Sequence, residues 1–140
     1  MLNILAQTYA TLSGDQTLAT LMGYTGNLPN TQIYTGRVDV VKEQASTIGL
    51  TMIVIKMVTE TFRTVPYNVR DARIQIDIFS QNNELSVAEI YERIATLLNF
   101  QILNNNGTHI FWQRLDGATE TYEREANIFH WTADMILWTT

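Results

Sequence analysis

Two alternating stretches constrain the fold of this chain more than any other feature of its sequence. Residues 73–79 alternate between polar and apolar side chains as far as Ile78, and within residues 127–138 the residues from Phe129 to Met135 alternate in the same way. Successive side chains of a strand point to opposite faces, so each stretch predicts a strand with one buried face and one polar face. The apolar set is Ile74, Ile76, Ile78, Phe129, Trp131, Ala133, Met135 and Leu137, and the polar set is Arg73, Gln75, Asp77, His130, Thr132 and Asp134.

Residues 48–59 show a different pattern, in which both alternating sets are largely apolar. Such a pattern indicates a central strand that is covered on both faces. We expect helices to cover one face and a neighbouring subunit to cover the other. Residues 59–69 contain Pro66 and several polar side chains, so we expect them to form the far end of a long hairpin that joins this strand to residues 73–79.

Helices are predicted at two places in the chain. Residues 86–100 carry one continuous apolar stripe, and Ser86 and Glu89 have the spacing of a capping box. Near the N-terminus, apolar residues recur at helical spacing up to Gly14, which ends this first helix. Asp15 is then expected to cap a short second helix, with Leu18, Leu21 and Met22 facing inward and Gly23 at its end.

The order of these elements predicts the fold class. After the N-terminal helices come a short strand at Ile33 and Tyr34, the long hairpin, the amphipathic helix, a strand from Thr108 to Leu115, a turn at Asp116 and Gly117, and the last strand. Strands joined by hairpins form antiparallel sheets. We therefore predict an α+β fold: a mostly antiparallel sheet, two main helices packed on one face and a long projecting hairpin, in one domain that spans residues 1–140.

The composition disfavours several classes of protein. The chain has no cysteine, which excludes disulfides, thiolate metal sites and cysteine nucleophiles and is compatible with a reducing cytoplasm. Its net charge is −5 and no two of its nine basic residues are adjacent, so stable nucleic-acid binding is disfavoured. An acidic protein can still line a passage through which DNA slides without sticking. No apolar run is long enough to span a membrane, and the N-terminus does not have the pattern of a signal peptide.

No catalytic, cofactor-binding or metal-binding arrangement is predicted. His109 and His130 could be neighbours if the last two strands pair, but two histidines without a third ligand do not make a zinc site. Neither histidine has an evident serine partner, and the glycines do not form a phosphate-binding loop. The sequence therefore favours a protein that is not an enzyme and needs no cofactor.

Three groups of residues are candidates for protein interfaces. The first lies on or near the projecting hairpin, where arginines and aromatic side chains gather. The second is an acidic segment expected to form a solvated loop that faces a partner. The third is an aromatic residue of the last strand that alternation places on the outer face. The candidates are Phe62, Arg63, Tyr67, Arg70 and Arg73 in the first group, Asp116, Glu120 and Glu123 in the second, and Trp138 in the third.

The order of elements, together with several short segments, resembles one known family. These segments are residues 15–23 followed by Ile33 and Tyr34, residues 73–80 leading into the helix that carries Ala88, Ile90 and Leu97, residues 122–125, and the final Leu137 and Trp138. In this respect the chain resembles the tail-terminator, or tail-completion, proteins of long-tailed bacteriophages, over nearly its whole length. The proline-rich piece often found after the first strand in that family is reduced here to Pro29, before the strand.

The resemblance implies a structural role in the tail-neck region of a virion assembled in the host cytoplasm. A ring, usually a hexamer, would bind the end of the tail tube, stop its polymerisation and join it to the head connector. Its partners would be further copies of itself, the tail tube protein and the connector or stopper protein, with DNA passing through the lumen.

Two other functions remain open at this point. One is another ring or adaptor of the phage neck, such as a head-closure protein. The other is a small α+β ligand-binding module or enzyme, which predicts a well-formed pocket with convergent polar groups.

Overall fold

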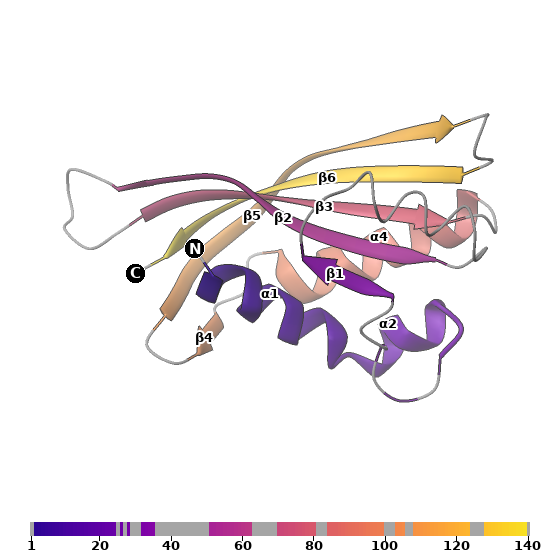
Figure 1. The fold of residues 1–140 in the computed structure, drawn as a ribbon, viewed down its shortest axis with the longest axis horizontal. Helices are drawn as coiled ribbons and strands as arrows, with labels where there is room; N and C mark the ends of the chain where they lie inside the picture. Colours follow the sequence, from indigo (N-terminus) through magenta and orange to yellow (C-terminus); the bar gives the residue numbers. More distant parts are fainter. Residues whose placement is uncertain are drawn as a thin grey trace.

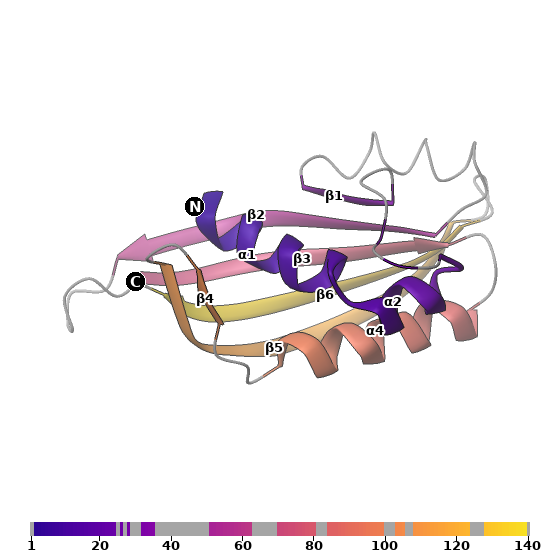
Figure 2. The same ribbon diagram turned by 90° about the horizontal axis from the view of Figure 1, so that it is seen from below.

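A computed structural model describes most of the chain: residues 2–24, 26, 28, 32–35, 51–62, 70–80, 84–99, 103–105, 108–123 and 128–139. Within these ranges, three helices lie beside one sheet (Figures 1 and 2). The helices are α1 (Leu2–Ser13), α2 (Gln16–Leu21) and α4 (Glu84–Leu98). The strands are β1 (Ile33–Thr35), β2 (Met52–Phe62), β3 (Arg70–Ser80), β4 (Leu103–Asn105), β5 (Thr108–Glu123) and β6 (Ile128–Thr139). None of the helices described is long and apolar enough to cross a membrane.

The six strands form one sheet in the order β1-β2-β3-β6-β5-β4. The pairs β2–β3, β3–β6, β5–β6 and β4–β5 are antiparallel, and only the short β1 runs parallel to its neighbour, β2. All three helices lie on the same face of the sheet, below it in Figure 1. The predicted α+β fold with a mostly antiparallel sheet and two main helices on one face is confirmed.

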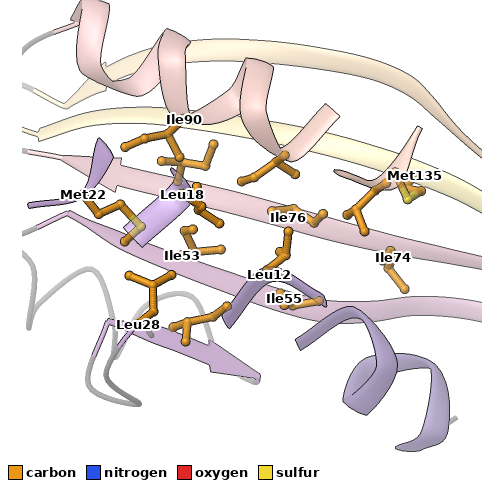
Figure 3. Packing of buried hydrophobic residues seen from close by; sticks show 14 of the residues in the cluster. Leu12, Leu18, Met22, Leu28, Ile53, Ile55, Ile74, Ile76, Ile90 and Met135 are labelled. Carbon is orange, nitrogen blue, oxygen red and sulfur yellow. The ribbon is translucent and has the colours of Figure 1, made fainter. Parts of the chain in front are cut away.

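The core lies between the helices and the facing side of the sheet (Figure 3). Ile74, Ile76 and Ile78 of β3 are fully buried there, as are Met135 and Leu137 of β6. Helix α4 contributes its predicted stripe, with Val87, Ile90, Ile94 and Leu98 buried and Tyr91 stacked on Trp131 at a ring-centroid distance of 5.0 Å. The inward faces predicted for the two alternating strands are therefore confirmed.

Two details of the predicted helices are wrong. Helix α4 begins at Glu84, so Ser86 lies inside the helix and is not its N-cap, as the predicted capping box required. In α2, Leu21 is 37% exposed, whereas Leu18, Ala19 and Met22 are buried. The buried side of this short helix is centred on residues 18, 19 and 22, and Leu21 lies at its margin because each residue turns the helix by about 100°.

Asp15 is the N-cap of α2, as predicted, and it also ties this helix to α4. Its Oδ2 atom accepts a hydrogen bond from the backbone N–H of Leu18 at 2.8 Å. The guanidinium of Arg93 donates to both carboxylate oxygens, at 2.9 and 2.7 Å. The hydrogen bonds from Arg93, together with that from Leu18, outweigh the effect of burial and lower the pKa of Asp15.

We expect Asp15→Ala to destabilise the protein by about 1–2 kcal/mol, because both the cap and the bidentate contact with Arg93 are lost. Urea unfolding at neutral pH measures this loss. Thr17→Ala is the control, since Thr17 is an exposed residue of the same helix and its loss is expected to cost under about 0.5 kcal/mol. Equal effects of the two substitutions would show that Asp15 makes neither contact in solution.

The outer face of the sheet, opposite the helices, is partly buried within the single chain. Met52, Val54 and Phe79 belong to this face by register and are fully buried. The prediction that β2 is covered on both faces is confirmed for residues 52–55, but at this end of the strand the cover does not require a neighbouring subunit. Toward the hairpin end the face opens, and Val58 is 44% exposed. Among the described strands β2 is also not central, because β1 alone lies beyond it.

Strand β5 is longer than predicted. A turn was expected at Asp116 and Gly117, but β5 runs through both residues to Glu123. Its register against β6 shifts between Leu115 and Gly117, which marks a β-bulge or similar irregularity. A bulge accommodates an extra residue without ending the strand, so Asp–Gly marks an irregularity in β5 and not a turn.

The long hairpin is formed by β2 and β3, which pair from Met52 and Phe79 to Phe62 and Arg70. In Figure 1 its far end extends past α1. The far end of the hairpin was predicted at residues 59–69; residues 59–62 belong to β2, and residues 63–69 lie outside the described residues.

Candidate interaction surface

A polar cluster centred on Asp77 lies on the outer face of the sheet. Asp77 is on β3 and is fully buried, and its partner across the β3–β6 pair is Thr132. The Thr132 hydroxyl donates to Oδ1 of Asp77 at 2.8 Å, and Nε2 of His130 lies 2.8 Å from the same oxygen. The amide of Gln75 donates to both carboxylate oxygens, at 3.1 and 3.0 Å. The ring of His130 stacks on Phe79 with centroids 4.2 Å apart.

The electrostatics of Asp77 favour its charged form. Burial alone would raise the pKa of this carboxyl, because a buried charge loses its hydration. The hydrogen bonds from His130, Thr132 and Gln75 more than offset burial, so the pKa of Asp77 is lowered. Both oxygens of this buried carboxylate accept a hydrogen bond from Gln75 on the same strand. Oδ1 also accepts a hydrogen bond from Thr132 on β6.

The geometry of the cluster is that of a structural clamp rather than an activated nucleophile. A nucleophilic threonine would give its proton to a base, but the Thr132 hydroxyl donates to Asp77. In a catalytic triad, the acid contacts the ring nitrogen of histidine that does not face the nucleophile. Here Asp77 and Thr132 both contact Nε2 of His130, so Asp77 does not orient the ring in that way. What the cluster does is join β3 to β6 through three side chains on the outer face.

The sequence pattern placed Asp77, His130 and Thr132 on outward faces but did not pair them. The possible pairing of His109 with His130 is wrong, because His130 lies opposite Thr121 and His109 is at the other end of β5. No group of three potential metal ligands occurs among the described residues.

Of the predicted interface residues on the hairpin, three fall on described strands. Phe62 pairs with Arg70 where β2 and β3 approach the tip, and Arg73 lies further along β3 opposite Thr59. Arg70 and Arg73 are both half-buried. Arg63 and Tyr67 lie outside the described residues.

Trp138 lies on the outer face of β6, as predicted from alternation. It pairs with Asp71 of β3 on one side and with Trp112 of β5 on the other, and it is half-buried. An aromatic side chain that remains partly exposed between two strands is a suitable contact point for a protein partner.

The predicted acidic loop is not a loop. Asp116, Glu120 and Glu123 all lie on β5, where Glu120 pairs with Trp131 and Glu123 with Ile128. Because β5 continues through the Asp–Gly pair, the acidic residues follow one strand near the edge of the sheet. They and the hairpin arginines are on different strands, with β6 between β3 and β5.

Gln113 is a buried polar residue that the sequence pattern did not single out. It lies on β5 opposite Leu137, on the helix-facing side, and is fully buried. Among the described residues, neither its amide nitrogen nor its amide oxygen has a hydrogen-bond partner. An unpaired buried amide costs about 1–3 kcal/mol.

We expect Gln113→Leu to stabilise the protein by about 1–3 kcal/mol, because an apolar side chain of similar size replaces an unpaired amide. The same substitution at Gln75 is the control and should have the opposite sign, since the amide of Gln75 donates to Asp77. Thermal unfolding of both variants measures the difference. Destabilisation by both would indicate that the amide of Gln113 is hydrogen-bonded in solution.

An open depression of about 360 Å³ lies between α1 and β1, lined by Leu5, Ala6, Tyr9 and Thr35. Ligand sites combine an enclosed apolar cavity with a few convergent polar groups. The four described residues that line this depression carry no charge.

The comparisons with known proteins concern the fold alone. No family model matches the chain, and no curated protein matches it in sequence. A chain in the solved virion of a native gene transfer agent particle has a similar structure, with a TM-score of 0.66 and 13% sequence identity. The match covers 96% of this chain and 92% of that chain. The two chains share one fold.

Proposed function

We propose that this chain is a structural protein of a tailed virion, and within that class a tail terminator: a ring that caps the tail tube. The observation that carries the proposal is the match of the fold, over nearly all of both chains, to a chain of a gene transfer agent virion. The resemblance of the sequence to bacteriophage tail terminators leads independently to the same class.

The proposed mechanism depends on contact surfaces and requires no bond chemistry. One end of the ring is complementary to the last ring of tube protein. The other end lacks the surface that tube protein presents to further tube subunits, so no further subunits bind and polymerisation stops there. A closed ring made from identical head-to-tail contacts satisfies both requirements. The net charge of −5 suits a lumen through which DNA passes without binding.

The test is removal of this chain from the particle that encodes it. We expect tails of irregular or excessive length, with few of them joined to heads, and restoration of normal tails when the intact chain is supplied in trans. Electron microscopy of negatively stained lysates measures both tail length and the fraction of joined particles. Tails of normal length would refute tail termination, and normal tails beside empty, leaking heads would instead identify a head-closure protein of the neck.

A second measurement tests the ring itself. We expect native mass spectrometry of the purified chain, alone or with tail tubes, to show an oligomer with a fixed number of copies. We expect microscopy of the same preparations to show closed rings with a central hole wide enough for duplex DNA, about 20 Å or more across, and lined by few positively charged side chains. A chain that remains monomeric in both preparations would refute the ring.

A further inference from the structure

Strands β3 and β6 form the regular centre of the sheet. They pair residue for residue over the whole of β3, from Arg70 to Ser80, with no shift of register. The strands on either side of this central pair, β2 and β5, each contain an extra residue at the same level of the sheet. Two regular strands therefore lie between two strands that are locally longer.

The extra residues are identified by the register. In β2 the extra residue is Val58, because the residues before and after it lie opposite two consecutive residues of β3. In β5 the extra residue is Asp116, because the residues before and after it lie opposite two consecutive residues of β6. One extra residue in one strand of an antiparallel pair is the arrangement of a β-bulge.

Both extra residues directly follow the outer members of one row that crosses all four strands. This row consists of Met57 of β2, Ile74 of β3, Met135 of β6 and Leu115 of β5. Because β2 and β5 run in opposite directions, the two extra residues lie on opposite sides of the row. They are thus related by an approximate two-fold axis through the middle of the central pair.

Extra length in both outer strands fits a twist of the sheet better than a bend in its plane. In a twisted sheet, a strand far from the twist axis follows a longer path than a strand near that axis. An extra residue on one side alone would bend the sheet in its own plane toward the other side, whereas one on each side cancels this bend. Bulges also increase the local right-handed twist.

Figure 1 shows a strong twist between the two ends of the sheet. At the end where β2 begins, β5 is the uppermost of these four strands in the view and β2 is the lowest. At the hairpin end their order is reversed, because the strands cross in the view between the two ends. The hairpin half of the sheet is therefore turned relative to the half that carries the helices.

We infer that Val58 and Asp116 act together as one device, which sets the twist of the sheet at this row and thereby the direction in which the hairpin projects. The central strands stay regular, so Ile74 and Met135 remain fully buried against the helices while the outer strands take up the extra length. Val58 itself is 44% exposed, so its side chain adds little to the core.

Deletion of the extra residues tests whether they act together. The residues before and after each of them already point to opposite faces, so a deletion leaves the register and the faces of the other residues unchanged. Three strand intervals, about 14 Å, separate the two sites, and changes that far apart add when they are independent. The variants lack Val58, Asp116 or both, and urea unfolding measures their transition midpoints.

We expect the double deletion to lower the midpoint by at most about half the sum of the two single shifts. A single deletion leaves one unbalanced bulge, whereas the double deletion leaves a regular four-stranded sheet. The matched control is the deletion of Phe111, which is a further extra residue of β5 but lies nearer the hairpin end. Because Phe111 does not adjoin the same row, its shift is expected to add to that of the Val58 deletion.

Crystal structures of the natural chain and the double variant measure the twist itself. We expect the angle between β2 and β5 at this row to fall by about 20°, roughly the rotation between two neighbouring strands. The packing of α1 and α4 on the central pair is expected to stay the same. An unchanged angle would refute the role of the extra residues in the twist.

The unfolding outcomes are equally decisive. A double deletion that folds when a single deletion does not would support the shared device. Single shifts that add in the double variant, or a double variant that does not fold, would refute it.

The proposed function supplies one more expectation, which rests on the ring. The folded double variant should form about tenfold fewer closed rings than the natural chain, because its hairpin projects in another direction. A normal yield of rings from this variant would show that assembly does not depend on that direction. A natural chain that forms no rings, free or on tail tubes, would refute the ring and leave the inference about the twist intact.

Discussion

Asp77→Ala is expected to destabilise the protein by about 3 kcal/mol or more, because it leaves buried hydrogen-bond donors without an acceptor. Asp77 is fully buried, and the side chains of Gln75, His130 and Thr132 all contact its carboxylate. Urea unfolding at neutral pH, followed by circular dichroism, measures the loss as a shift of the transition midpoint. A cost under about 0.5 kcal/mol would show that the clamp between β3 and β6 contributes nothing to the folded state.

Asp134→Ala is the matched control for this substitution. Asp134 lies on the same face, opposite Gln75, but it is only partly buried, so its removal is expected to cost under about 0.5 kcal/mol. The comparison separates the loss of a buried, hydrogen-bonded carboxylate from the loss of one negative charge on the sheet.

The effect of Asp77 also depends on pH, and its sign follows from the lowered pKa. A carboxyl whose pKa is lower in the folded state contributes its full stability above its unfolded value of about 3.9 and loses it as pH falls through the folded value. The stability difference between the natural chain and Asp77→Ala is therefore expected to be constant above about pH 5 and to shrink below about pH 4. A difference that stays constant down to pH 2 would show that the carboxylate is not stabilised by its neighbours.

Ile76→Ala is the second substitution with a large expected effect, about 2–5 kcal/mol of destabilisation. Ile76 is fully buried on the helix-facing side of β3, with Ile55 and Ala133 as its cross-strand neighbours (Figure 3). Truncation removes buried apolar surface and leaves a cavity between the sheet and the helices, because the packed neighbours close it only in part. Guanidinium unfolding measures the change in free energy.

Val58→Ala is the control for Ile76→Ala, since Val58 is an apolar residue of the same sheet that is 44% exposed. It is expected to change stability by under about 0.5 kcal/mol. If the two substitutions cost the same, the core would not lie where the structure places it.

The local elements of the fold could be predicted from the sequence because their signals are local. The alternation of isoleucines in β3 and of apolar residues in β6 gave the inward face of each strand correctly, and the stripe of α4 identified its buried side. Asp15 was recognised as an N-cap from its position alone. Errors occurred where a residue type has two uses: Asp116 and Gly117 accompany a bulge as readily as a turn, and Ser86 fits a helix interior as well as a cap.

The candidate surface depended on contacts between distant parts of the chain. Asp77 meets His130 because β3 pairs with β6 rather than with the next strand along the chain, and no local pattern specifies that choice. The burial of Met52 and Val54, the unpaired amide of Gln113 and the continuation of β5 likewise depend on what packs beside them. By itself the sequence determined which side chains each strand and helix turns inward, because backbone geometry sets those periods. Only the tertiary structure decided which strands became neighbours, because strand pairing is a long-range competition among several compatible partners.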